Sequence, residues 1–277
     1  AWTSVSRLPL PICALFGSSA FWAPARAEQL MGTFDLLESV AEDRGFALWH
    51  ERHMQAPAAI YGFLWLCCLV TLGFDAVDEP LTGLLVAFFC LVLFSLFFML
   101  ACVCRILNKS VDSFCCEALG DLDVPDISDL WNLTQAVVRK SSGAIQRGLV
   151  TCGLVLAAVL PLMLSGLAHD IATGPFGYKE VRYQLVPVLT ACGAAYVVVA
   201  AAKISEKCTR VPSLINALSF GSGTERARQH VVDYIVSSGA GFYVFGIRVT
   251  MEMVLKFAYG WSMVGVALGS RLLGDGL

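Results

Sequence analysis

Five apolar segments of about 20 residues divide this chain, and they constrain its fold more than any other feature. A helix needs ~20 apolar residues to cross the hydrocarbon core of a bilayer, and its backbone groups must be hydrogen-bonded within the chain there. The sequence therefore predicts an all-α, polytopic membrane bundle. We expect the five spanning helices at 57–76, 81–107, 148–168, 185–204 and 249–272.

A sixth and weaker apolar stretch, 8–24, lies in the opening segment 1–25. Two interpretations stay open for it. It is either the stub of a truncated span or a targeting signal, because Ala25-Arg26-Ala27 resembles a signal-peptide cleavage site.

The distribution of Lys and Arg predicts the orientation of the chain in the membrane. Fourteen of these residues lie before residue 57, in the segment 105–147 or in the segment 203–241, whereas the alternate segments and the C-terminal tail hold three. The first set is therefore expected in the cytosol, with the C-terminus on the other side of a plasma membrane or endomembrane. We expect cytosolic amphipathic helices at 26–56 and, within the membrane bundle 57–277, cytosolic helical loops at 108–147 and 205–241.

Composition argues against several functional classes. Charged residues make up 15% of the chain, against roughly 25% in soluble domains, and no basic stripe indicates a nucleic-acid partner. Most of the eleven cysteines lie in or beside apolar runs, which is not typical of a disulfide framework. No His accompanies the close pairs Cys102/Cys104 and Cys115/Cys116, so we expect no metal site. No catalytic motif is visible, and the sequence predicts neither an enzyme nor a cofactor.

The fourth apolar segment, 185–204, is rich in Ala, Gly and Val. Small side chains let neighbouring helices approach closely, so this helix is expected to pack against protein rather than lipid. We expect it to continue beyond the membrane and to end near Pro212.

The strongest local signals lie in the last fifty residues. A water-compatible helix, 225–236, leads into a run of small residues that predicts a helix break. Gly239, Gly241 and Gly246 are the hinge candidates, because glycine tolerates backbone angles that other residues avoid. Two alternatives remain: a gating hinge and a fixed break between two helices.

The final apolar segment carries Arg248, Glu252 and Lys256, spaced four apart, which would place all three on one face of a helix. Charges within a membrane helix are costly and usually face a partner or water. The three residues form either a salt-bridged ladder or the charged lining of an ion path, and Tyr259 joins them as a pore or gating candidate.

Aromatic and Met side chains in the spans offer a ligand pocket or simple core packing. The residues weighed for these two roles are Tyr61, Trp65, Phe74, Met163 and Tyr196.

The stretch from Ser237 to Tyr243, followed by the last span, resembles the C-terminal signature of the insect odorant and gustatory receptor superfamily. It is more similar to the plant and protist gustatory-receptor-like branch. The matching residues are Arg228-Gln229, Tyr234, Ala240-Gly241 and Val244-Phe245-Gly246. The last span departs from the insect pattern, because Ala258 precedes Tyr259 and Val264 stands where the gustatory receptors carry Gln.

The resemblance implies a ligand-gated cation channel with seven spans, assembled as a homotetramer in the lipid bilayer and opened by a small molecule. The five apolar segments would then correspond to spans three to seven, and the last span would line the central path. The alternative is a non-conducting structural or organellar membrane protein.

Overall fold

The structure of the protein is a computed structural model that describes residues 24–45, 47–75, 80–119, 124–173, 178–217 and 225–275. Within these ranges the chain is almost entirely helical, as predicted, and the exception is one short pair of strands. The elements are α3 (Pro24–Asp43), α4 (Ala47–Asp75), α5 (Pro80–Ala118), α6 (Val124–Thr173), α7 (Tyr178–Ala217), α8 (Glu225–Ser237), β1 (Tyr243–Val244), β2 (Ile247–Arg248) and α9 (Met251–Asp275). The segment 8–24 lies outside the described residues except for its last residue.

Three helices in the described part of the chain are long and apolar enough to cross a membrane, which identifies a membrane protein. A shorter apolar helix accompanies them. The three candidates are Gly83–Ala118, Pro125–Val159 and Leu185–Ala217, and the shorter helix is Pro57–Leu72.

These three helices are much longer than a bilayer is thick. Helices α5, α6 and α7 contain 39, 50 and 40 residues. At ~1.5 Å per residue they measure about 58, 75 and 60 Å, against a hydrocarbon core of about 30 Å. Each must therefore project from the membrane. Most of the expected helical loops are extensions of these helices, and within the loop 205–241 only α8 (Glu225–Ser237) is a separate helix.

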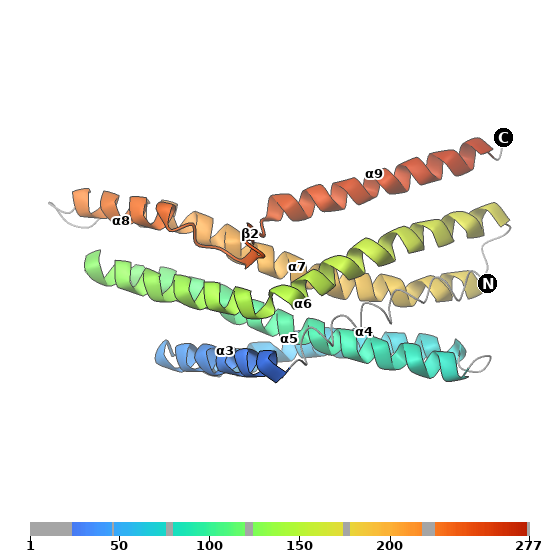
Figure 1. Ribbon diagram of the computed structural model, residues 1–277, viewed down its shortest axis with the longest axis horizontal. Coiled ribbons are helices and arrows are strands. Elements are labelled where there is room, and N and C mark those ends of the chain that lie inside the picture. The colour runs from blue at the N-terminus through green and yellow to red at the C-terminus, as the bar shows by residue number, and fades with distance from the viewer. Residues whose placement is uncertain are drawn as a thin grey trace.

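The extended helices divide the molecule into two halves along its long axis (Figure 1). The polar half contains α3, α8 and the adjoining ends of α5, α6 and α7, and the apolar half contains α4, α9 and the remainder. The polar ends comprise residues 108–118 of α5, 124–147 of α6 and 205–217 of α7. Helix α9 lies along the top of the apolar half and diverges from α7 toward the C-terminus (Figure 1).

Helix α5 lies at the centre of the core and packs against α4, α6 and α7. Its side chains Leu93, Phe97 and Leu100 in the apolar half and Phe114 in the polar half are fully buried. Burial of large apolar side chains against several neighbouring helices gives this fold one continuous core.

Helix α7 contacts both α5 and α6 through small residues. Ala194 and Ala201 are fully buried, which confirms the prediction that this helix packs against protein. The predicted end near Pro212 is wrong, because α7 continues to Ala217. Val211 and Ile215 are buried on either side of the proline, and this packing outweighs the loss of one backbone hydrogen bond.

Gly193 of α7 lies at a close contact between helices. A Cβ atom there would lie 3.1 Å from Phe97 and 3.3 Å from Phe94, and the Tyr61 hydroxyl donates a hydrogen bond to the Gly193 carbonyl at 3.2 Å. A larger side chain at this position would crowd the facing aromatic rings.

We predict that Gly193→Leu lowers the free energy of unfolding by about 1–3 kcal/mol, because it overpacks the seam between α5 and α7. The matched control is Gly143→Leu on α6, where a Cβ meets nothing within 4 Å. Thermal unfolding of the detergent-solubilised protein measures both. Equal losses in the two variants would contradict the packing argument.

Candidate functional site

The predicted helix break between residues 237 and 246 is present, and we call residues 238–250 the joint. Helix α8 ends where Gly239 adopts a φ of 58°, the left-handed conformation that terminates many helices. The last turn is closed by a hydrogen bond of 2.9 Å from the Ser238 amide to the Tyr234 carbonyl.

The joint contains an unexpected β-hairpin. Strands β1 and β2 pair antiparallel, with Tyr243 opposite Arg248 and Val244 opposite Ile247. The connecting residues have positive φ, 48° at Phe245 and 79° at Gly246. This is the arrangement of a type I′ turn, which matches the twist of a two-residue hairpin. Gly246 adopts it freely, whereas the left-handed conformation of Phe245 costs roughly 1–2 kcal/mol.

Helix α6 holds the first part of the joint. The Trp131 indole donates to the Ser238 hydroxyl at 3.0 Å. The Ser238 carbonyl accepts from Gln135 at 2.8 Å and from Arg139 at 3.2 Å. Further along α6, the side-chain oxygen Oε1 of Gln146 accepts from the Phe245 backbone amide at 3.2 Å. Backbone groups that the helix break leaves free are therefore paired by one neighbouring helix.

Helix α7 holds the second part. The Ser205 hydroxyl accepts from the Phe242 amide at 2.9 Å, and the Phe242 side chain is fully buried. The Arg248 guanidinium donates to the Ser205 carbonyl and to the Thr209 hydroxyl, both at 3.0 Å. A Cβ atom at Gly241 would collide with the Arg248 side chain. Gly241 thus makes room for the guanidinium and, unlike Gly239 and Gly246, has no positive φ.

The predicted ladder of three charges is wrong at Arg248. This residue lies in β2, and its side chain turns back onto α7 instead of lying on the face of the last helix. Helix α9 begins only at Met251, and the Thr250 hydroxyl accepts from the Met253 amide at 3.3 Å as its N-cap. Thr250 was the sequence signal that could have located this helix start.

Glu252 and Lys256 form the ion pair that their spacing predicts, with 2.6 Å between Lys256 Nζ and Glu252 Oε1. Their side chains are 73% and 75% exposed, and Tyr259, one turn further on, is 67% exposed. At 100° per residue these three positions share one stripe of α9. They therefore point away from the rest of the described molecule.

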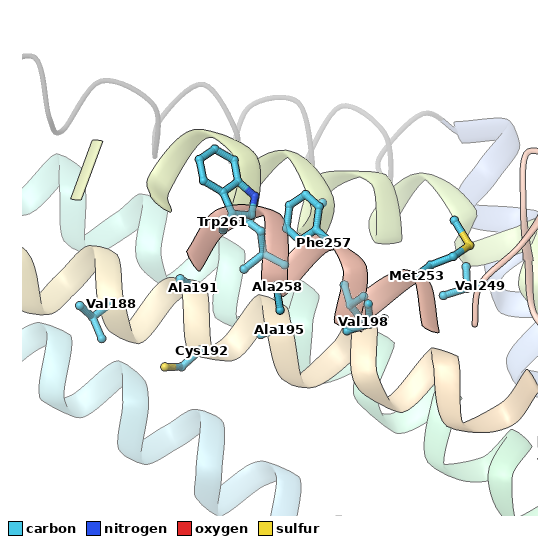
Figure 2. Close-up of a pocket in the computed structure, with 13 residues that line it drawn as sticks. Val188, Ala191, Cys192, Ala195, Val198, Val249, Met253, Phe257, Ala258 and Trp261 are labelled. Carbon is cyan, nitrogen blue, oxygen red and sulfur yellow. The ribbon is translucent and has the colours of Figure 1, made fainter. Parts of the chain in front are cut away.

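The opposite face of α9 closes an apolar groove of about 490 Å³ against α6 and α7 (Figure 2). Small residues on the two facing helices, such as Gly153, Ala191 and Ala195, leave the space open. Met253, Phe257 and Trp261 of α9 form the other wall, and none of the described side chains that line the groove is charged. The shape and chemistry suit an apolar ligand.

The sequence left two roles open, a ligand pocket or core packing, for a different set of aromatic and Met side chains. The Tyr61 ring is buried and meets the rings of Tyr196 and Phe98 edge-on, at centroid distances of 6.1 and 6.4 Å. Neither Tyr61 nor Tyr196 lines the groove, and neither does Trp65. The predictions for the Phe74 and Met163 side chains fall outside the described side chains.

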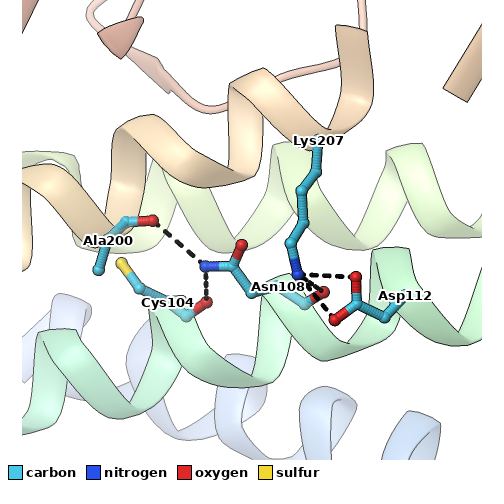
Figure 3. Close-up of polar contacts among 5 residues, drawn as sticks. All are labelled: Cys104, Asn108, Asp112, Ala200 and Lys207. Carbon is cyan, nitrogen blue, oxygen red and sulfur yellow. Dashed lines mark hydrogen bonds and ion pairs between the residues drawn. The ribbon is translucent and has the colours of Figure 1, made fainter. Parts of the chain in front are cut away.

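A polar cluster joins α5 to α7 near the boundary of the two halves (Figure 3). Lys207 Nζ lies 2.7 Å from both Asp112 carboxylate oxygens and also donates to the Asn108 carbonyl at 3.3 Å. The Asn108 amide donates to the carbonyls of Cys104 and Ala200 at 2.9 and 3.2 Å. This cluster was not predicted, because its charged partners are 95 residues apart.

A second set of polar contacts joins the turn after α3 to α5 and α6 within the polar half. Arg44 donates to the Ser110 carbonyl at 3.2 Å and to the Thr134 hydroxyl at 3.0 Å. Burial lowers the pKa of the Arg44 guanidinium, and the Glu117 carboxylate, 4.0 Å away, opposes that shift.

Among the described residues, no group of three or more His, Cys, Asp or Glu side chains is placed to hold a metal ion. The chain matches no protein-family model and no curated protein. The candidate site consists of the joint, the exposed stripe of α9 and the apolar groove beneath it.

The Lys207–Asp112 pair should matter more than an exposed pair on the same helix. We predict that Lys207→Met lowers the unfolding free energy by about 1 kcal/mol, since its side chain is only 36% exposed. Arg210→Met should have no measurable effect, because Arg210 is 75% exposed. Chemical denaturation in detergent compares them, and an equal effect would contradict the role of the cluster.

Gly241 and Arg248 should be energetically coupled. Gly241→Ala alone should cost about 1–3 kcal/mol, because the methyl group displaces the guanidinium. In an Arg248→Ala background the same change should cost much less, so the double variant loses less than the sum of the two single losses. A double-mutant cycle on thermal unfolding measures this, and strict additivity would refute the contact.

Proposed function

We propose that this chain is a gustatory-receptor-like membrane protein that forms a ligand-gated ion channel from several copies, with α9 lining the path. In this proposal α4, α5, α6, α7 and α9 are the five spans, and the polar half lies in the cytosol. The exposed stripe of Glu252, Lys256 and Tyr259 carries the proposal.

The charged pair on α9 is unsuited to lipid. Lys256 lies only five residues into the helix, about 8 Å from its start at 1.5 Å per residue. Charges at such positions in a membrane helix usually face water or a partner. Since the stripe points away from α6 and α7, the partner is best supplied by other copies of the chain around a water-filled path.

The remaining surface of α9 supports the same arrangement. Large side chains are exposed around most of its circumference, and the helix packs mainly against α6 and α7. Those at least 40% exposed and outside the groove include Leu255, Tyr259, Met263, Val264 and Val266. A helix with so little contact inside its own subunit is suited to an interface between subunits.

The apolar groove supports a ligand-gated mechanism. Its volume of about 490 Å³ falls within the range of small-molecule sites, roughly 300–1,000 Å³. An apolar ligand there would contact α7 and α9 together, and it would shift the protein toward whichever arrangement of the two helices binds it better.

A non-conducting structural or organellar protein is the second candidate, and one observation favours it. Glu252 and Lys256 neutralise each other, so the pair can serve as a helix-stabilising bridge without any pore. The two proposals differ in whether the purified protein conducts.

Planar-bilayer recording of the purified, full-length chain tests the channel. If it conducts, Lys256→Gln should increase cation conductance about twofold or more, because Glu252 is then left unpaired beside the path. A unit charge ~8 Å away through water contributes about 0.5 kcal/mol, or roughly twofold in local cation concentration. The matched control is Lys140→Gln, at an exposed position of α6 in the polar half.

Two results would refute the proposal. Absence of current from correctly inserted protein, tested with a panel of apolar ligands, would favour the non-conducting alternative. An equal change in cation conductance in Lys256→Gln and Lys140→Gln would show that the exposed stripe of α9 does not line the conducting path.

A further inference from the structure

The tip of the β-hairpin presents two large apolar side chains that nothing in the described structure covers. Phe245 is 62% exposed and Ile247 is 60% exposed, and Gly246 between them is exposed as well. The rest of the joint is tightly bonded to α6 and α7. Within the joint, only residues 245–247 are exposed. An apolar patch of this kind indicates a surface that contacts something outside the subunit.

Two helices independently locate this tip at one edge of the membrane-spanning region. Gln146, which binds the Phe245 amide, comes just before the apolar run of α6 that starts at Gly148. Ser205, which binds the Phe242 amide, directly follows the apolar run of α7 that ends at Ile204. The hairpin therefore lies where both helices leave the hydrocarbon core.

The backbone of Phe245 adds a second argument. Asn, Asp and Gly are the usual residues at the first central position of a type I′ turn, because φ is positive there. This chain instead holds a phenylalanine at φ 48° with its ring directed outward. Burial of the ring would offset the conformational cost of this backbone. A bilayer interface would bury it, because aromatic side chains favour that region of the membrane.

Charges at the same level favour phospholipid headgroups as those surroundings. Arg147 of α6 and Lys203 of α7 are both exposed, and along their helices they lie one and two residues from Gln146 and Ser205, at about the same depth in the membrane. Two acidic residues in the described part of the chain that lie near this level, Glu206 and Glu252, are each held in an ion pair. The local surface is thus basic, which is complementary to anionic lipid.

We propose that the hairpin tip is a membrane-interface anchor: Phe245 and Ile247 enter the boundary between headgroups and acyl chains, and Arg147 and Lys203 contact anionic headgroups. The anchor sets the depth at which the chain enters the bilayer before α9. It requires no conduction and is therefore independent of the channel proposal.

Photo-crosslinking tests the anchor. The full-length chain, with benzoyl-phenylalanine replacing Phe245, is reconstituted into vesicles of phosphatidylcholine and phosphatidylglycerol and irradiated. We expect covalent lipid adducts, detected by mass spectrometry, at a yield at least several-fold above that from the same probe at Leu133. Leu133 is a matched control, since it is 50% exposed on α6 but lies in the polar half. The probe at Ile247 provides a second variant should the first fail to fold.

The products distinguish the occupants of the tip. Crosslinks to a second copy of the chain, seen at twice the mass on a denaturing gel, would overturn the proposal and place the tip between subunits. A lipid yield no higher than that of Leu133 would also overturn it.

The headgroup contact has its own readout. Phosphatidylglycerol should be enriched among the adducts at residue 245, and the enrichment should disappear in Arg147→Gln/Lys203→Gln. If the protein that keeps Arg147 and Lys203 gave phosphatidylglycerol adducts only in proportion to the phosphatidylglycerol in the vesicles, the role of the two basic residues would be overturned.

Discussion

A helix break at the edge of a membrane leaves backbone amides and carbonyls without partners, and lipid supplies none. The fold meets this constraint by placing the break against two extended helices. Gln135 and Arg139 of α6 bind the Ser238 carbonyl, and Ser205 of α7 binds the Phe242 amide. Both helices continue past their apolar runs, and this brings Gln135, Arg139 and Ser205 beside the joint.

The same contacts connect parts of the molecule that are distant in sequence. Lys207 and Asn108 tie α7 to α5, and Arg248 ties the start of α9 to α7. Helix α9 is thus held firmly at its first residues and packed loosely beyond them, with the apolar groove along one side. In the proposed channel, an apolar ligand in the groove would contact α9 beyond its first residues and could change the position of that part of the helix.

The three glycines of the joint show what a local sequence pattern can predict and what it cannot. All three were hinge candidates from sequence, and the helix break they predicted is present. Their physical roles differ, however. Gly239 and Gly246 supply positive φ, whereas Gly241 provides space for Arg248. Only the contact with a residue seven positions later, across a hairpin, reveals the second kind of role.

The sequence alone determined the features that depend on local spacing: long apolar helices, the break after α8, and the Glu252–Lys256 pair at i and i+4. Tertiary structure decided the rest. Arg248 left the predicted helix face because Gln146 and Ser205, distant in the chain, stabilise a hairpin that local pattern does not favour. The groove depends on how α9 diverges from α7, and that angle arises from packing between helices, which no single segment encodes.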